Sequence, residues 1–152
     1  MEGNPGPVPR IVAGVDGSPS SLAALRWAVR QAELTGATVD AVIAWHYPVI
    51  PAPMGPAPVA MLETADFEKA ADETVTDAIS AAVARDSDVH VSAQVKEGNA
   101  AQVLLDAAAG ADLLVVGSRG HGGFTEALLG SVSQHCVHHA SCAVVIVRMS
   151  GG

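Results

Sequence analysis

Two glycine-containing segments in the last third of the chain have the residue types of an anion-binding loop. Gly117-Ser118-Arg119-Gly120 is followed, after nine residues, by Gly130-Ser131. The first segment directly follows the apolar run 113–116, and a helical pattern starts near Ser131. Glycines let the backbone come close to an anion, and the unpaired N–H groups of a first helical turn point at it. A strand, a glycine loop and a helix N-terminus in this order predict a phosphate-binding site.

The spacing of these glycines separates the loop from two common nucleotide-binding motifs. G-x2-G-x9-G-S matches neither the P-loop pattern nor the dinucleotide fingerprint G-x-G-x-x-G. The two lysines of the chain, Lys69 and Lys96, both lie outside the loop, so lysine-assisted phosphoryl transfer has no support. No Gly-x-Ser-x-Gly nucleophile motif is present either. The loop therefore predicts binding of a phosphorylated ligand, and slow hydrolysis with Asp16 as the base stays open as an alternative.

A second candidate binding segment runs from Gly14 to Ser18, at the end of the apolar run 11–15. Ser18 followed by Pro19 is typical of a helix N-cap with proline at the first helical position. Asp16 has two interpretations at this stage. It is either a ligand contact or a further stabiliser of the helix start, where a carboxylate is favoured in any case.

The remaining pattern alternates between strands and helices. Apolar runs predict strands at 11–15, 39–45, 89–95, 111–116 and 143–147. Helical periodicity predicts helices from Pro19 to Gly36, over 67–82, after Asn99 and after Ser131; Asn99 with Gln102 and Ser131 with Gln134 have capping-box spacing. This order predicts an α/β domain of three layers with an open, five-stranded parallel sheet. With strand order 3-2-1-4-5, the first and fourth strands are neighbours at the switch point, and both candidate segments face one cleft.

Composition limits the class of protein and its partners. Of the 152 residues, 49% are hydrophobic and only 3% aromatic, which favours an aliphatic core of helices packed on a buried sheet. The net charge of −8 argues against nucleic acid or an anionic membrane as the main partner. No apolar run approaches the roughly 20 residues of a membrane span. We expect one domain over 10–149, a loose lead-in over 1–9, a proline-rich loop over 48–58, and a cytoplasmic location with reduced thiols.

A cluster of histidines and cysteines near the C-terminus invites a metal interpretation. The segment is His135-Cys136-x-His138-His139-x-x-Cys142, and thiolate and imidazole ligands at helical spacing can bind zinc. However, neither a Cys-x2-Cys pair nor a His-Glu-x-x-His motif is present. We therefore expect no metal, with the histidines at the surface or packed and the thiols inert.

The two candidate binding segments and the C-terminal tail resemble the ATP-binding subgroup of the universal stress protein family. The resemblance rests on Asp16-Gly17-Ser18, on Gly98, on the pattern of Gly117, Gly120 and Gly130-Ser131, and on the tail 139–148, in which Ala143 replaces the family's commoner proline. It covers about residues 10–148. It implies a Rossmann-like fold of the adenine nucleotide hydrolase-like type.

The resemblance also implies an ATP site, with Mg²⁺ possible, and assigns residues to it. Gly117 and Gly120, backed by Val116, match the segment that binds the ribose and the start of the phosphate chain. Gly130, Ser131, Val132 and Ser133 match the segment that receives the phosphates, with hydroxyl donors on the two serines. Asp16 matches the aspartate near the nucleoside, and adenine is expected at the end of the second strand, beside Ala44 or Trp45. Arg119 and His121 are the cations nearest the expected phosphates.

The implied function is a nucleotide-dependent regulator of a stress response, with an adenine nucleotide as ligand. Two alternatives are a cyclic AMP-binding protein and a slow adenine-nucleotide hydrolase on the same fold. A third is a structural protein that dimerises and binds partners. Strand 143–147 would present an exposed apolar edge unless it pairs with another chain, and such pairing is typical of the family. We expect a homodimer through this strand.

Overall fold

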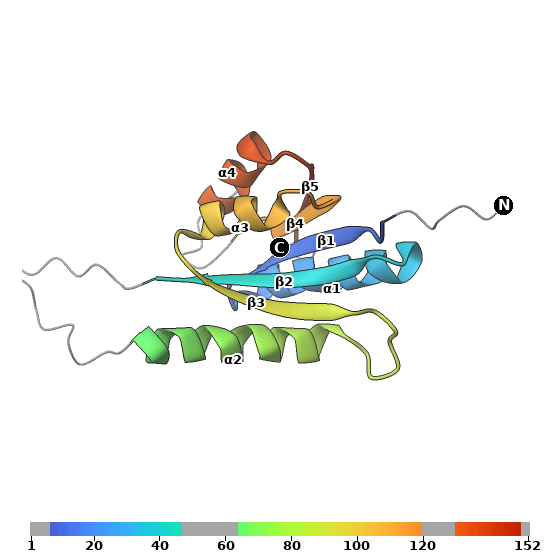
Figure 1. The fold of residues 1–152 in the computed structure, drawn as a ribbon, viewed down its shortest axis with the longest axis horizontal. Coiled ribbons are helices and arrows are strands. Elements are labelled where there is room, and N and C mark those ends of the chain that lie inside the picture. Colours follow the sequence, from blue (N-terminus) through green and yellow to red (C-terminus); the bar gives the residue numbers. More distant parts are fainter. Residues whose placement is uncertain (1–6, 47–63, 120–129, 150–152) are drawn as a thin grey trace, which may run out of the picture.

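In the computed structural model, residues 7–46, 64–119 and 130–149 are described. They form alternating strands and helices, shown in Figure 1. The strands are β1 (Arg10–Val15), β2 (Thr38–Trp45), β3 (Val91–Glu97), β4 (Leu113–Gly117) and β5 (Ala143–Val147), and the helices are α1 (Pro19–Thr35), α2 (Thr64–Ala82), α3 (Ala100–Ala108) and α4 (Ser131–His139). The proline-rich loop, Gly120 and His121 lie outside the described residues.

The sheet confirms the predicted fold. Its strand order is β3-β2-β1-β4-β5, and every pair of neighbours is parallel. Helices α1 and α2 cover one face, while α3 and α4 cover the other (Figure 1). Within the part of the chain that the structure describes, no helix is long and apolar enough to cross a bilayer.

The alternation of side chains along each strand divides the core between the two faces. In β1, Ile11, Ala13 and Val15 pack toward α1 and α2, while Val12 packs toward α3 and α4. The same alternation in β2 sends Val42 to the α3 and α4 side. Alanine, valine, leucine and isoleucine fill both layers almost alone, as the low aromatic content predicts. Small aliphatic side chains let the helices lie close to the sheet, which suits a parallel sheet buried on both faces.

Three helix ends follow the local sequence. Ser18 caps α1: its side chain accepts from the Ser21 amide at 3.1 Å, and Pro19 is the first helical residue. Gly36 ends α1 with φ of 79°, a left-handed conformation that favours glycine. Asn99 caps α3 by accepting from the Gln102 amide at 3.2 Å. The Gln102 side chain, however, donates to Asp106 at 2.8 Å, as a helix neighbour four residues away, so only half of the capping box forms.

Three of the predicted element starts are wrong. The N-cap of α4 is Gly130, which makes no side-chain capping bond, and Ser131 is the first helical residue instead of the cap. Strand β3 starts at Val91 instead of Val89, because the Val89 amide donates to the Ser87 hydroxyl in the preceding turn. Strand β4 likewise starts two residues later than predicted, where pairing with Ile11 begins. Periodicity shows that an element exists, but its ends depend on turn hydrogen bonds and on the neighbouring strand.

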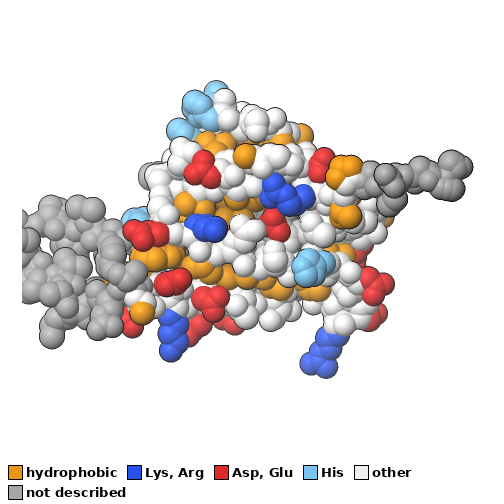
Figure 2. Space-filling model, in the orientation of Figure 1, with side chains coloured by type: hydrophobic (Ala, Val, Ile, Leu, Met, Phe, Trp, Pro, Cys, Tyr) orange, Lys and Arg blue, Asp and Glu red, His pale blue; other side chains and the backbone are white. Residues whose placement is uncertain are grey.

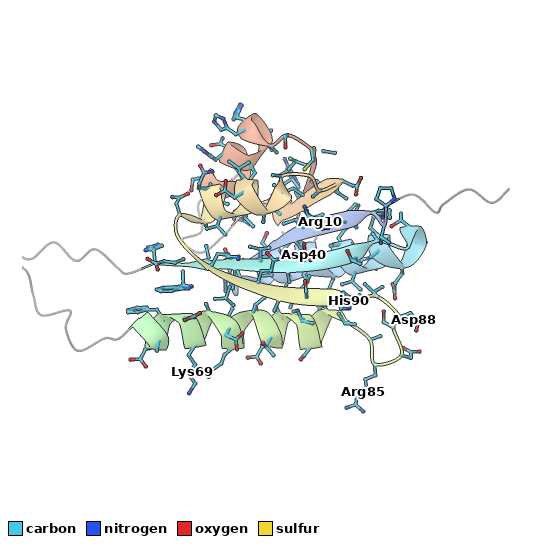
Figure 3. The ribbon with its side chains drawn as sticks, viewed as in Figure 1. Arg10, Asp40, Lys69, Arg85, Asp88 and His90 are labelled. Atoms are coloured by element: carbon cyan, nitrogen blue, oxygen red, sulfur yellow. The ribbon has the colours of Figure 1, made fainter. Side chains whose placement is uncertain are left out.

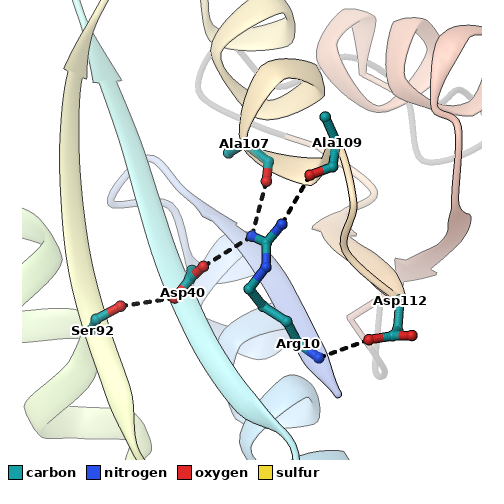
Figure 4. A network of polar contacts seen from close by, with 6 residues as sticks. All are labelled: Arg10, Asp40, Ser92, Ala107, Ala109 and Asp112. Carbon is teal, nitrogen blue, oxygen red and sulfur yellow. Dashed lines mark hydrogen bonds and ion pairs between the residues drawn. The ribbon is translucent and has the colours of Figure 1, made fainter. Parts of the chain in front are cut away.

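A polar network ties the strands together at the amino edge of the sheet, away from the segments with candidate binding residues (Figures 3 and 4). The Arg10 guanidinium bonds the Asp40 carboxylate at 3.0 Å and two backbone carbonyls at the end of α3. Asp40 also accepts from the Ser92 hydroxyl at 2.8 Å. One residue of β1 therefore connects β2, β3 and α3. The network comprises Arg10, Asp40, Ser92, Ala107, Ala109 and Asp112.

Candidate functional site

The ends of β1 and β4 bring the two candidate segments together at the carboxyl edge of the sheet. The strands pair from Ile11–Leu113 to Ala13–Val115, and this pairing stops two residues before either strand ends at Val15 and Gly117. Strand order reverses at this point, where ligands of open α/β sheets bind. The predicted neighbourhood of the two segments is therefore present in the fold.

Asp16 lies in the turn between β1 and α1, and its side chain is exposed. The Ser18 amide donates to Asp16 Oδ1 at 2.8 Å, and the Asp16 amide donates to the Ser21 hydroxyl at 3.2 Å. Gly17 between them has φ of 84°, which favours glycine in this turn. Asp16 therefore stabilises the turn that starts α1, as the helix-start interpretation predicts. A carboxylate has room for several donors, so the turn fixes its direction and leaves a ligand contact compatible.

Buried serines gather at this edge. Among the described residues, the buried polar side chains are Ser18, Ser20, Ser21 and Ser133, exposed by 3–7%. Ser18 and Ser21 bond each other across the first turn of α1, the Ser21 hydroxyl donating to the Ser18 carbonyl at 3.1 Å. The sequence interpretation missed Ser20 and Ser21. The available signal was a run of small polar residues directly after Pro19, where an amphipathic helix would start with apolar residues facing the sheet.

Gly117 is a glycine because α1 lies directly against it. A Cβ atom placed there would be 2.7 Å from both the backbone carbon and the carbonyl oxygen of Ser20, and would also collide with the Ser20 hydroxyl. Two residues later in the chain, the Arg119 amide donates to the Ser20 hydroxyl at 3.3 Å. The first helical turn after β1 and the end of β4 therefore form one packed unit.

Ser118 holds the ends of the glycine loop together. Its amide donates to the Val147 carbonyl of β5 at 2.9 Å, and its carbonyl accepts from the Gly130 amide at 2.7 Å. The Ser133 hydroxyl donates to the Gly130 carbonyl at 3.0 Å and approaches the Ser118 carbonyl at 3.4 Å. This arrangement fixes the N-terminus of α4 beside the ends of β4 and β5, although 11 residues lie between Ser118 and Gly130 in the sequence.

The first turn of α4 has the features of an anion site. It contains no acidic residue, and its Gly130 N-cap supplies no side-chain bond, unlike the caps of α1 and α3. Ser131 is exposed and Val132 is half-buried, whereas Ser133 is buried. The amides of a first helical turn have no partner within the helix and carry the positive end of its dipole. Because the Ser133 hydroxyl already donates to Gly130, this residue offers a ligand its amide more readily than its hydroxyl.

Ala44 and Trp45 lie on opposite faces of the sheet. Both extend beyond β1, whose last pair with β2 is Val15–Ile43. Trp45 packs against the core beneath α1 and α2, and its carbonyl accepts from the Gly98 amide at 2.8 Å. Ala44 packs on the α3 and α4 side. Ala44 is therefore the candidate that shares a face with the α4 N-terminus.

Gly14 and Val116 belong to the packing on that same face. Val116 is 4% exposed. A Cβ on Gly14 would lie 2.9 Å from Leu104 Cδ1 and 3.4 Å from Val116 Cγ1. Gly14 therefore makes room for α3, and these residues support the edge from beneath.

The histidine and cysteine cluster divides between the core and the surface. Cys136 is fully buried, and burial together with the nearby Cys142 raises its pKa to about 11, so its thiol stays neutral at pH 7. His135, His138 and His139 are exposed on the other side of α4. Among the residues that the structure describes, no group of three or more His, Cys, Asp or Glu side chains is placed to hold a metal ion.

Comparison with known proteins identifies the family. The model of the universal stress protein family matches residues 7–148. The chain belongs to this family. A universal stress protein of Mycolicibacterium smegmatis is 33% identical over 139 residues, which are 91% of this chain and 47% of that protein. The chain thus spans about half the length of the curated relatives it matches.

Solved universal stress proteins share the fold. UspA of Lactobacillus plantarum superposes with a TM-score of 0.76 at 24% identity, over 92% of this chain and 97% of that one. A universal stress protein in complex with cAMP superposes with a TM-score of 0.61 at 29% identity, over 91% of this chain and 95% of that one.

Proposed function

We propose that this universal stress protein binds ATP at the carboxyl edge of β1 and β4 and acts as a nucleotide-dependent regulatory module. One observation carries the proposal. Ser118 holds the acid-free N-terminus of α4, whose Gly130 cap makes no side-chain bond, at the end of β4. Strand β4 pairs with β1, the strand that leads into the Asp16 turn, so an anion-binding helix end and a ribose-binding carboxylate lie at the same edge of the sheet. Membership in the family and the cAMP complex of a related protein support an adenine nucleotide as the ligand.

The residues have distinct roles in this proposal. Asp16 accepts from the ribose hydroxyls, and Gly117, Arg119 and Gly120 follow the start of the phosphate chain. The amides of Ser131, Val132 and Ser133 receive the terminal phosphates, with the Ser131 hydroxyl as an additional donor. Adenine lies beside Ala44, because this residue shares the α4 face. Gly14, Ser18, Val116 and Gly130 shape the edge without needing to touch the nucleotide.

Magnesium fits this arrangement as a companion of the triphosphate. Mg²⁺ prefers phosphate oxygens, water and one or two carboxylates. Asp16 directly follows β1 at this edge, and its carboxylate would bind the ion directly or through water. The protein would then contribute position and charge, with the phosphates as the main ligands.

Cyclic AMP is the second candidate ligand, favoured by the complex of the related protein. The two ligands place different demands on α4. A triphosphate reaches the first turn of α4 with its terminal groups, whereas a cyclic monophosphate carries one charge close to the ribose. A negative charge introduced at Ser131 should therefore weaken ATP binding more than cAMP binding.

The test uses isothermal titration of both nucleotides into the wild-type protein, Ser131→Asp and Ser131→Asn. Ser131→Asp places a carboxylate near the terminal phosphates, and two charges about 4 Å apart in water repel by about 1 kcal/mol, roughly a fivefold loss of affinity. Ser131→Asn introduces a side chain of the same size as aspartate but without the charge. Its affinity for ATP should be within about twofold of that of the wild type. Ser131→Asp should at the same time stabilise α4, because a negative side chain in the first turn interacts favourably with the helix dipole.

The outcomes separate the hypotheses. Absence of ATP binding at millimolar nucleotide would contradict the proposal, and cAMP binding in the same experiment would support the second candidate. Equal ATP affinities of Ser131→Asp and Ser131→Asn would place the phosphates away from α4. Multiple-turnover phosphate release that Asp16→Ala abolishes, with binding retained, would favour the hydrolase alternative.

We also propose a homodimer through β5. This strand is at the edge of the sheet, and Val144, Val145, Ile146 and Val147 are all half-buried instead of buried. An edge strand with apolar residues on both faces favours pairing with another strand. Light scattering at micromolar concentration tests this, and a mass of one chain would count against it.

A further inference from the structure

The outer side of α4 carries a pair of histidines whose arrangement the proposed function does not use. His135 and His139 are four residues apart, one helical turn, and both are exposed. Their ring centroids lie 4.4 Å apart, with an angle of 37° between the ring planes. Figure 2 shows histidine side chains gathered over α4, at the top of the molecule.

A helix-dipole role explains only part of this cluster. His138 and His139 lie in the last turn, where a positive side chain complements the helix dipole. His135 lies one turn earlier, and its ring contacts the ring of His139. Helical spacing of four residues brings the two rings together, and the helix dipole gives no reason for His135 to be a member of the pair.

The separation of the two rings is slightly shorter than that of two imidazoles sharing one metal ion. An imidazole nitrogen lies about 2.0–2.1 Å from a bound Zn²⁺. Each ring centroid lies about 1.1 Å behind this nitrogen, so two imidazoles at about 90–110° around one ion have centroids about 4.5–5.2 Å apart. The observed 4.4 Å is within a small side-chain rotation of this range. Two histidines four residues apart on one helix face are also the ligand pair of helical zinc motifs.

The thiols do not belong to this pair. Cys136 is fully buried among side chains of the sheet and α3, on the opposite side of α4 from the histidines. The described residues offer no group of three ligands. The protein therefore supplies two imidazoles, and water or another molecule fills the remaining positions around an ion.

We propose that His135 and His139 bind a divalent transition-metal ion of the Zn²⁺ and Ni²⁺ class. Neutral imidazole suits these ions, whereas Mg²⁺ and Ca²⁺ prefer oxygen ligands. Both rings can bind the same ion, since the helix holds them on one face. The bound ion then links two turns of the nine-residue helix α4. The site does not depend on nucleotide, so it stands or falls separately from the function proposed above.

The test titrates Zn²⁺ into tag-free protein by calorimetry, in a Cys142→Ser background that removes the half-buried thiol as a competing ligand. His135→Ala and His139→Ala each remove one of two linked ligands, and we expect affinity to fall on the order of tenfold or more. His138→Ala is the matched control, because it removes a neighbouring exposed histidine outside the pair. It should change affinity less than about twofold. Circular dichroism of each variant checks that α4 and the fold are intact.

Paramagnetic Ni²⁺ gives a second readout that does not depend on heat. We expect it to broaden the amide resonances of residues 135–139 first, and His135→Ala to abolish this. Saturable Zn²⁺ binding that both pair variants weaken supports the proposal. Absence of saturable binding up to about 1 mM Zn²⁺, or an equal loss in His138→Ala, overturns it.

Discussion

Replacing Gly117 by alanine tests whether the first glycine of the loop serves packing as well as ligand binding. Its φ is outside the left-handed region, so alanine can adopt the same backbone conformation. The obstacle is α1, because the new Cβ would lie 2.7 Å from the Ser20 backbone carbon and carbonyl oxygen. Ordinary contact needs about 3.4 Å or more, so β4 and the first turn of α1 must separate by roughly 0.7 Å.

This displacement sets the expected loss of stability. Overpacking a well-packed site costs about 1–3 kcal/mol, and the smaller freedom of alanine in the unfolded chain returns about 0.4–1 kcal/mol. With the middle of each range, we expect Gly117→Ala to lower the free energy of unfolding by about 1.3 kcal/mol. Urea denaturation without nucleotide measures this, with an unchanged dependence on urea concentration as the sign of a two-state comparison.

Gly14→Ala is the matched control. Its Cβ would meet Leu104 Cδ1 at 2.9 Å, the end of a flexible side chain instead of backbone. The Leu104 side chain can rotate, so the loss should stay below about 1 kcal/mol. A Gly117→Ala protein as stable as wild type, but unable to bind ATP, would refute the packing argument and assign Gly117 to the ligand alone.

Two further changes test other parts of the structure. Arg10→Met leaves the Asp40 carboxylate, whose side chain is 13% exposed, without its cation; we expect a loss of roughly 1–3 kcal/mol in urea denaturation and unchanged ATP affinity, because the network lies at the opposite edge. Burial raises the pKa of Cys136 to about 11, so its neutral thiol stabilises the native state below the ordinary thiol pKa, and this contribution should disappear as pH rises toward 11. Unfolding measured from pH 8 to 11 should show the corresponding decline in wild type and a shallower decline in Cys136→Ala.

The sequence alone determined the elements whose signals are local. Ser18-Pro19 and Gly36 start and end α1 because capping and left-handed turns depend on neighbouring residues. Apolar runs alternating with helical stripes determined the parallel sheet, since each connection must cross over to a neighbouring strand. The glycine spacing and Asp16-Gly17-Ser18 indicated the family, which the match over residues 7–148 confirms.

Tertiary structure decided everything that depends on distant contacts. Gly130 caps α4 instead of Ser131 because its amide donates to the Ser118 carbonyl, on the far side of the loop. Ala44 shares the α4 face and Trp45 does not, because the register of β2 assigns each side chain to one side of the sheet. The hydrophobic period of a helix or strand is visible among neighbouring residues of the sequence. The partner that a backbone group or side chain contacts depends on the packing of the whole chain.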